Sequence, residues 1–130
     1  MATITINMLS GAVENENADF MVRFSEAALA AGHAVNIFLY GNGCNMANKE
    51  VPWTGEKGIT EALGAHMDAS RMADRIAALA ARGASIHTCH TTEYGRGTEG
   101  CDYLDGVARG NVGVSLMKFW MTSDVAFTLG

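Results

Sequence analysis

The stretch "AAGHAVNIFLYGNG", residues 30–43, decides the fold. A glycine follows an alanine-rich segment, and residues 33–40 then run almost without interruption through apolar side chains. Nearly continuous apolar runs are typical of parallel strands that are buried on both faces of a sheet. The stretch therefore predicts a buried strand over 33–40, which follows a helix and leads into a loop that contains glycine.

The segment on its N-terminal side predicts a strand followed by that helix. Residues 3–9, "TITINML", alternate and are rich in β-branched side chains, as strands are. Residues 18–32, "ADFMVRFSEAALAAG", have the periodicity of a helix. Its expected core-facing stripe consists of four residues at helical spacing: Phe20, Phe24, Ala27 and Ala31. We expect Asn15 or Asn17 to cap the start of this helix and Gly32 to end it.

The C-terminal side continues the alternation of helices and strands. An irregular loop is expected over 41–58, which contains the only proline, Pro52, and a second polar loop over 90–100. The remaining expected elements are helices over 59–67, 68–83, 101–108 and 115–123 and strands over 84–89 and 124–130. Three residues of the helix over 68–83 are expected to face the core: Met72, Ile76 and Leu79. Gly83 is expected to end that helix.

The order of these elements predicts an α/β fold with a single layered domain over residues 1–130. Strands that alternate with helices form a mostly parallel central sheet, and right-handed crossovers place the helices on both of its faces. The chain has 130 residues, of which 48% are hydrophobic, so it can bury a sizeable core. No shift in composition marks a second domain.

The charge of the chain excludes some classes of partner. The formal net charge is −5, and the nine Lys and Arg residues form no run. Non-specific binding to nucleic acid or to an anionic membrane surface needs a basic patch, so neither is expected. The sequence also predicts no signal peptide and no membrane-spanning segment, which favours a cytoplasmic protein.

Three segments follow the predicted strands at the sheet edge where ligands and reactive groups gather in α/β folds. They are "SGAVENEN" (10–17), "GNGCNMANK" (41–49) and "CHTTEYGRG" (89–97). Two of the three carry a cysteine, Cys44 and Cys89, and neither matches the glycine pattern of a phosphate-binding or dinucleotide-binding loop. The third cysteine, Cys101, lies at the end of the polar loop that follows Cys89.

A metal site is the first alternative for this region. His87, Cys89, His90 and Cys101 carry donor atoms that zinc accepts. On an extended strand, however, His87 and Cys89 point to one face and His90 points to the other. The region contains no CxxC or HxxxH pair, so we expect neither a metal ion nor another cofactor.

A disulfide and a hydrolytic triad are the next alternatives. The chain has three cysteines, an odd number, and a reducing cytoplasm keeps thiols free, so a permanent disulfide is disfavoured. A transient bond between Cys89 and Cys101 within a thiol relay stays open. The adjacent His90 is badly placed to orient on the Cys89 thiol, which also disfavours a cysteine hydrolase.

Two interpretations of Cys89 remain. Free cysteines serve most often as small buried packing residues. Cys89, however, lies where a strand gives way to a loop, with His90 adjacent and Arg96 near in sequence, and either cation could favour a thiolate.

The order and spacing of several segments resemble the DsrE/TusD-like sulfur-relay proteins over nearly the whole chain. These segments are "SGAVENENADFMVRFSEAALAAGHAVNIFLYGNGCNMANK" (10–49), "ASIHTCHT" (84–91) and "DVAFTLG" (124–130). The first includes "FLYGNG" and an N-x-A-N element from Asn45 to Asn48. No single motif is specific, whereas their order and spacing together are.

The resemblance implies a sulfurtransferase or sulfur carrier with the same α/β fold. In that family a cysteine after the third or fourth strand takes up sulfane sulfur as a persulfide, and this position matches Cys89. The sulfur then passes to or from a small TusA-like or rhodanese-like carrier protein, in sulfur oxidation or in tRNA thiolation. Cys101 is a possible second or resolving thiol, and Cys44 stands where TusD-like proteins have an apolar residue.

The resemblance also implies trimers or hexamers, either of one chain or of homologous chains. Eight methionines, a slightly positive mean hydropathy and apolar residues in the last third of the chain favour an oligomer as well. One large apolar group is expected to lie in the core or at a subunit interface: Trp53, Met117, Phe119 and Trp120. The alternative function is that of a structural or partner-binding subunit without catalytic activity.

Overall fold

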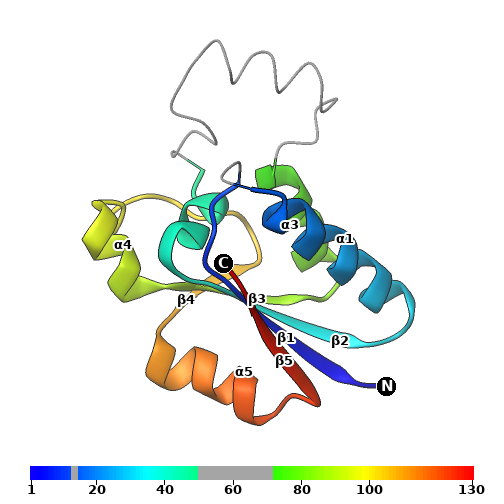
Figure 1. Cartoon of the computed structure of the whole chain (residues 1–130). Helices are drawn as coiled ribbons and strands as arrows, with labels where there is room; N and C mark the ends of the chain where they lie inside the picture. Colours follow the sequence, from blue (N-terminus) through cyan, green and yellow to red (C-terminus); the bar gives the residue numbers. More distant parts are fainter. Residues whose placement is uncertain (13–14, 50–71) are drawn as a thin grey trace.

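The computed structural model describes residues 1–12, 15–49 and 72–130, and a five-stranded parallel sheet forms its centre (Figure 1). The sheet has the order β4-β3-β2-β1-β5, and all four neighbouring pairs run parallel. The strands are β1 (Thr3–Met8), β2 (Ala34–Leu39), β3 (Ser85–Cys89), β4 (Val107–Gly110) and β5 (Val125–Leu129). The predicted α/β fold with a mostly parallel sheet is confirmed.

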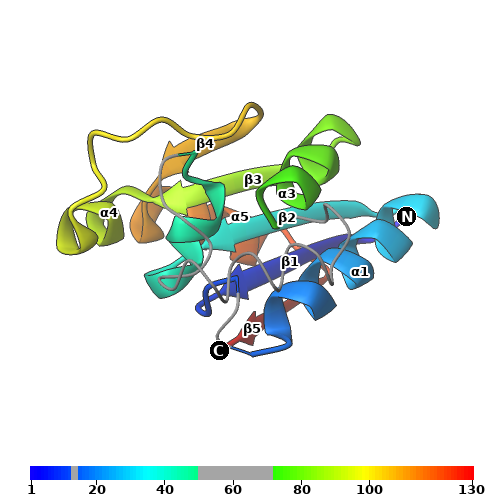
Figure 2. The same ribbon diagram turned by 90° about the horizontal axis from the view of Figure 1, so that it is seen from above.

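Helices cover both faces of this sheet (Figures 1 and 2). The helical elements are α1 (Asn17–Ala30), the 3₁₀ helix η1 (Gly41–Ala47), α3 (Met72–Ala81), α4 (His90–Arg96), the π turn η2 (Val112–Leu116) and α5 (Met117–Met121). Helices α1 and α3 lie on one face, where their apolar residues join those of the strands in the main core. Helix α5 lies on the other face and helps to form a smaller core.

The opening stretch forms the predicted strand. β2 pairs with β1 on one side and with β3 on the other, which buries it between two neighbours. Val35, Ile37 and Leu39 point into the main core, and Phe38 points into the smaller one. Both faces of the strand are therefore apolar, which explains its continuous apolar pattern.

The predicted core stripe of α1 is wrong except for Phe24, which is partly buried and packs against the main core. The buried face of α1 consists of five other residues: Ala18, Met21, Val22, Ser25 and Ala28. Phe20 is 49% exposed, and its ring stacks on that of Phe24, which meets the ring of Phe127 on the edge strand β5 edge to face. The two aromatic rings therefore flank the core at the margin of the sheet, and the smaller side chains allow the close approach of α1 to the strands.

The ends of the two helices on this face agree largely with the sequence. Gly32 and Gly83, beyond the ends of α1 and α3, have φ angles of 82° and 100°, a region that glycine adopts without strain. The N-cap position of α1 is Glu16, whereas the predicted cap Asn15 accepts a hydrogen bond from the Asn17 amide N–H (2.8 Å). The three predicted inward residues of α3 are buried: Met72, Ile76 and Leu79.

Three predictions for the remaining connections are wrong where the structure describes them. Residues 41–47 are not irregular but form η1, in which Gly43 approaches the Met8 carbonyl so closely that a Cβ would overlap it. The polar segment after Cys89 is α4 rather than a loop, and Gly97, with a φ angle of 68°, ends it. The helix predicted over 101–108 is absent, and this segment instead forms an isolated bridge at Tyr103 and a turn at Gly106 before β4 begins.

The predicted helix over 59–67 and residues 50–58 of the predicted loop lie outside the described residues. The final helix and strand of the prediction are present as α5 and β5. Within residues 1–12, 15–49 and 72–130, no helix is both long and apolar enough to cross a membrane.

Candidate functional site

Cys89 is the last residue of β3, at the carboxyl edge of the sheet. It pairs with Gly110 of β4, and its side chain belongs to the smaller core, together with Phe38, Leu116 and Phe119. The residue is only 1% exposed. The strand end thus holds the thiol on the face of the sheet that α5 covers.

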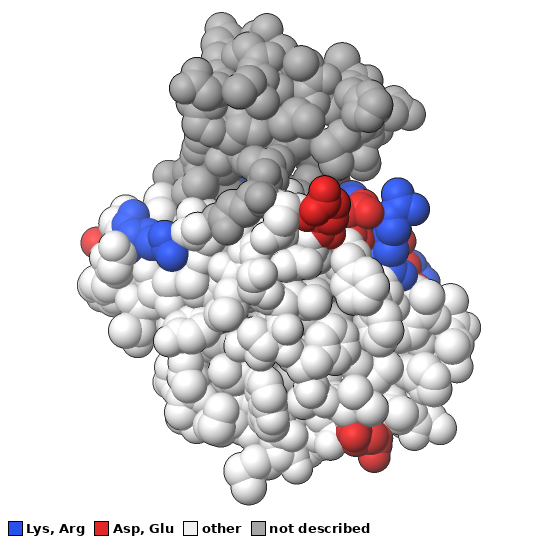
Figure 3. All heavy atoms as spheres, in the orientation of Figure 1, with Lys and Arg blue, Asp and Glu red and all other residues white. Residues whose placement is uncertain are grey.

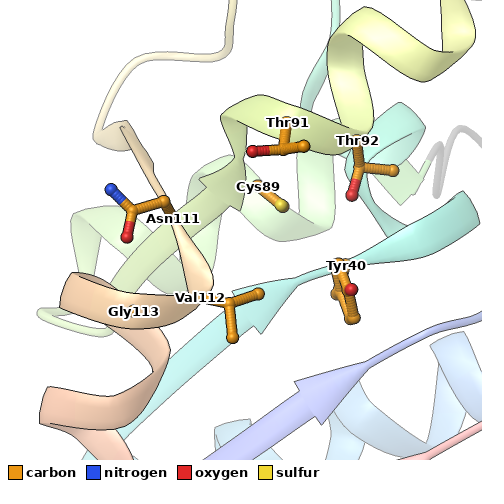
Figure 4. A pocket seen from close by; sticks show the side chains of 7 residues that line it. All are labelled: Tyr40, Cys89, Thr91, Thr92, Asn111, Val112 and Gly113. Atoms are coloured by element: carbon orange, nitrogen blue, oxygen red, sulfur yellow. The ribbon is translucent and has the colours of Figure 1, made fainter.

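A cavity of about 520 Å³ opens beside this thiol. Besides Cys89, six residues line it: Tyr40, Thr91, Thr92, Asn111, Val112 and Gly113. Figure 4 shows the sulfur directed into the space between α4, the end of β2 and the start of η2. None of the lining side chains carries a charge, so the cavity offers hydroxyl and amide groups beside apolar surface.

The η2 wall of the cavity depends on a close approach at Gly110. A Cβ at this position would overlap the Ser115 hydroxyl and lie 3.1 Å from Nδ1 of His87. Next to it, Asn111 caps η2, because its Oδ1 accepts a hydrogen bond from the Val114 N–H (2.7 Å). The absence of a side chain at Gly110 therefore lets η2 turn directly over the end of β4.

A buried carboxylate lies behind the α4 wall. Glu93 is fully buried and accepts hydrogen bonds from the Thr88 hydroxyl (2.7 Å) and from Nε of Arg109 (3.3 Å). Arg109 also donates to the Cys101 carbonyl (2.7 Å), and its guanidinium lies 4.5 Å from the centre of the Tyr103 ring. This network joins β3, α4, β4 and the segment before β4.

Cys44 is buried in η1, outside the cavity lining. Its thiol donates a weak hydrogen bond to Oδ1 of Asn45 (3.7 Å). Burial raises the pKa of the Cys44 thiol to about 11, and the nearby charge of Arg96 offsets only part of this effect. Cys44 is therefore protonated at neutral pH, which makes it a poor nucleophile.

Cys101 lies apart from the cavity. It is half-buried, and its carbonyl is held by Arg109, whose side chain leaves β4 on the face opposite to Gly110 and Cys89. Cys101 is not among the residues that line the cavity. Of the two thiols that the sequence suggested as a relay pair, Cys89 alone therefore lines this cavity.

The two predicted cations also lie outside the cavity lining. His90 is exposed at the start of α4, and its ring packs edge to face on Tyr94. Nε of the exposed Arg96 donates to the Gly41 carbonyl (3.0 Å), which joins the end of α4 to η1. The His90 contact thus lies within α4, and the Arg96 contact joins α4 to η1.

His87 shares the face of Cys89, as predicted. Its ring meets Phe119 edge to face, and its Nδ1 is buried with no hydrogen-bond partner among the described residues. Burial, followed by the charge of Lys118, lowers the pKa of His87. Among the described residues, no group of three or more His, Cys, Asp and Glu side chains is arranged to hold a metal ion.

Sequence reasoning missed the residues that give the cavity its walls. Thr91 and Thr92 were placed in a loop, and Asn111–Gly113 received no role. Asn111 carried a usable signal, since asparagine is a preferred helix cap and a helix was expected shortly after it. The wall itself depends on β4, whose four residues give too short a pattern to recognise.

Comparison with known proteins identifies a family and several structures with the same fold. The DsrE/DsrF-like family profile matches residues 3–119. No curated protein is similar enough in sequence to count as a match.

Three solved structures share the fold. The YchN protein from E. coli is 19% identical, with a TM-score of 0.77 over 99% of this chain and 100% of that one. MTH1491 from Methanobacterium thermoautotrophicum is 14% identical, with a TM-score of 0.65 and coverage of 99% and 100%. BT1422 from Bacteroides thetaiotaomicron is 12% identical, with a TM-score of 0.59 and coverage of 98% and 95%. At these identities the likeness shows the fold alone.

Proposed function

The chain belongs to the DsrE/DsrF-like family, and from this premise we propose that it is a sulfurtransferase or sulfur carrier that holds sulfane sulfur as a persulfide on Cys89. Membership of this family supports a role related to sulfur relay in general. The observation that carries the finer proposal is that Cys89 is the one cysteine of the three that lines the described cavity.

The proposed step needs a thiolate and an accessible donor sulfur. The Cys89 thiolate attacks the outer sulfur of a donor persulfide, forms the new S–S bond and releases the donor as a thiolate. The proton of the donor persulfide stays on the transferred sulfur or exchanges with water. No oxidant, reductant or cofactor is consumed, because the sulfane sulfur keeps its oxidation state.

The size of the cavity suits this step. A volume of about 520 Å³ is many times the ~10–15 Å³ that a cavity needs to hold one water molecule, so the end of a donor chain fits beside the thiol. Around the thiol, the smaller core shields the base of the side chain. Such shelter slows oxidation of a persulfide and its loss to other thiols.

The lining of the cavity favours a sulfur donor carried by a protein, of which only the slender end of the chain enters the cavity. A small dianionic donor such as thiosulfate would need positive charge, and no lining side chain supplies it. We therefore propose TusA-like or rhodanese-like carriers as exchange partners. In this scheme Cys101, which lies outside the lining, is dispensable for loading of Cys89 with sulfur. His90 and Arg96 affect the Cys89 thiol at most through their charge and do not contact the transferred sulfur.

The chain is proposed to act in the cytoplasm as one domain within a homo-oligomer or a hetero-oligomer of homologous chains. Several large apolar side chains around α5 are exposed: Val114, Met117, Trp120, Met121 and Val125. Charged side chains are sparse in the lower half of Figure 3, where α5 and β5 lie. Of the predicted apolar group, Phe119 is buried in the smaller core, whereas Trp53 lies outside the described residues.

A subunit without catalytic activity is the alternative function, and the burial of Cys89 favours it. In that case Cys89 is a packing residue of the smaller core. Native thiol labelling at neutral pH separates the two functions. A persulfide carrier gives one thiol that reacts faster than the others, whereas a passive subunit gives three slow ones.

Loading with polysulfide tests the proposal directly. Wild type, Cys89→Ser, Cys101→Ser and Cys44→Ser are treated with polysulfide, freed of excess reagent and weighed as intact proteins. Wild type, Cys101→Ser and Cys44→Ser are expected to gain the mass of one sulfur atom, and Cys89→Ser is not. If Cys89→Ser loads as readily as wild type, the assignment of the persulfide to Cys89 is wrong.

A further inference from the structure

The ion pair between Glu93 and Arg109 lies directly behind the Cys89 cavity. Thr88 pairs with Arg109 across β3 and β4, and the next residues, Cys89 and Gly110, pair with each other. Because side chains alternate along strands, the first pair points to one face of the sheet and the second pair to the other. The ion pair and the cavity thus occupy opposite faces of the same two strand ends.

Each member of this ion pair is close in sequence to one wall of the cavity. Glu93 directly follows Thr92, which lines the cavity from α4. Arg109 precedes Asn111 by two residues, and Asn111 lines the cavity from the start of η2. A contact between Glu93 and Arg109 therefore fixes the position of one wall relative to the other.

The contacts of Glu93 also span Cys89 along the chain. The hydrogen bond from Thr88 to Glu93 connects the residue before Cys89 with the first turn of α4 (2.7 Å). A fully buried carboxylate is unfavourable unless it is paired and hydrogen-bonded, and both of its oxygens are engaged here. The first turn of α4 is thus bound to the end of β3 through Thr88 and to the end of β4 through Arg109.

Arg109 holds a third segment in the same arrangement. Its Nη2 donates to the Cys101 carbonyl (2.7 Å), and the guanidinium stacks on Tyr103, which bridges to Asn48 beyond η1. Arg109 serves its two acceptors from two nitrogens of one rigid, planar guanidinium, Nε and Nη2, whereas an ammonium group has a single nitrogen. Arg109 therefore connects the two walls of the cavity with the segment from Cys101 to Tyr103 on the opposite face of the sheet.

Resting on the proposed sulfur-carrier function, we propose that Glu93 and Arg109 are positioning residues that hold the α4 wall and the η2 wall together, so that the cavity admits slender sulfur donors to Cys89 and excludes bulky thiols. Neither residue touches the transferred sulfur in this scheme. Their contribution is the width of the entrance, which decides which thiols meet a persulfide on Cys89.

Alkylation of Cys89 with a small and a bulky reagent tests this role. The rates with iodoacetamide and with a fluorescein maleimide are measured at neutral pH on the folded full-length protein, and the Cys89 peptide is quantified by mass spectrometry. The ratio of the two rates reports the entrance width and does not depend on any sulfur-transfer activity. The variants are Arg109→Gln and, as matched control, Arg75→Gln, which removes an arginine that bridges α3 to Asp19 of α1 (2.7 Å).

Arg109→Gln is expected to shift the ratio by about tenfold in favour of the bulky reagent, because a charge-assisted contact that opposes local opening is lost. Arg75→Gln is expected to leave the ratio unchanged while it lowers the melting temperature. If Arg109→Gln lowers the melting temperature but leaves the ratio at the wild-type value, the residue is merely structural and the proposal is wrong.

Two further variants keep the test decisive. If Arg109→Gln does not fold, Arg109→Lys replaces it, since lysine keeps the charge but has one nitrogen in place of the two that contact Glu93 and the Cys101 carbonyl. The double variant Glu93→Gln/Arg109→Gln leaves no unpaired charge buried behind the cavity. It therefore shows whether a shifted ratio comes from displaced walls or from the unpaired charge of Glu93. Its ratio of alkylation rates is expected to shift like that of Arg109→Gln. A wild-type ratio in the double variant overturns the proposal, whereas a failure of polysulfide loading at Cys89 overturns only the proposed function.

Discussion

At the scale of single residues, three cysteines in one small chain have three different environments. Cys89 lines a cavity, Cys44 is buried in η1, and Cys101 lies half-buried in the segment held by Arg109. Since thiolate formation and access decide the reactivity of a thiol, these environments rather than the residue type assign the roles. The assignment leads to separate predictions for Cys44 and for His87.

Cys44 is expected to alkylate slowly in the folded protein at neutral pH. Its pKa is raised from 9.0 to about 11 by burial, so both the thiolate fraction and access are low. Below pH 9 the thiol is neutral in the folded and the unfolded protein, and between pH 9 and about 11 only the unfolded form ionises, so stability falls in that window. Peptide-level labelling across pH measures the rate, with urea-denatured protein as the control.

The result that contradicts this prediction is a Cys44 that reacts at neutral pH as fast as Cys89. Such a result would mean that η1 opens readily, and Cys44 would then compete for incoming sulfur.

His87 is expected to make the protein less stable as the pH falls. Its folded pKa lies below the ordinary 6.5 because of burial, so the unfolded state takes up a proton first as the pH drops through 6.5. His87→Asn is therefore expected to lose less stability than wild type between neutral and mildly acidic pH. Urea unfolding of both proteins at several pH values measures this loss of stability. At alkaline pH the imidazole is neutral in the folded and the unfolded protein, so the difference measured there is the packing cost of the substitution.

The sequence predicted the position of Cys89 but not its surroundings. A cysteine that ends an apolar strand must lie at the carboxyl edge of the sheet, and this follows from the pattern alone. The failure to bring His90 or Arg96 into the cavity lining has a local cause, because α4 directs one toward Tyr94 and the other toward Gly41. Side-chain direction within an unrecognised helix cannot be obtained from spacing along an assumed loop.

At the scale of elements, β4 and η2 determine the shape of the site. β4 escaped prediction, and only the last two residues of η2 fall within the helix predicted over 115–123. β4 has four residues, "VARG", and neither alternation nor a continuous apolar run identifies it. α4 was missed because its seven residues are almost all polar and include Gly95. Tertiary contacts of Glu93 stabilise α4 where local propensity does not.

The close approach of η2 to Gly110 gives a prediction at this scale. Gly110→Ala is expected to destabilise the fold by about 1–3 kcal/mol, because the new methyl group overlaps the Ser115 hydroxyl and forces η2 away. Displacement of η2 also changes the alkylation rate of Cys89. Gly95→Ala is the matched control, since a Cβ there meets no atom within 4 Å. Equal stability of the two variants in urea unfolding would contradict the packing described for η2.

At the scale of the whole molecule, one face of the sheet contains most of the apolar core and the other contains the candidate site. The face covered by α1 and α3 contains the large apolar core, while the face covered by α5 carries the cavity and the smaller core. This division was predictable from sequence only in part. The continuous apolar run of β2 indicated two covered faces, but the offset of the α1 stripe depends on how α1 meets the edge strand β5.

The core on the α1 and α3 face is expected to dominate stability. Ile76→Ala is predicted to cost about 2–5 kcal/mol, because it leaves a cavity among fully buried side chains. Met121, which is 85% exposed, is the control, and Met121→Ala is expected to change stability by less than about 0.5 kcal/mol in the monomer. A cost of Ile76→Ala as small as that of the control would show that α3 does not pack as described.

The central claim concerns the site on the face covered by α5, where Cys89 is proposed to carry the transferred sulfur. The most direct measurement is peptide mapping of the wild-type protein after polysulfide loading and alkylation under native conditions. We expect the mass of one added sulfur atom on the peptide with Cys89, while the peptides with Cys44 and Cys101 remain unloaded. Added sulfur on either of those peptides, with Cys89 unmodified, would contradict this claim.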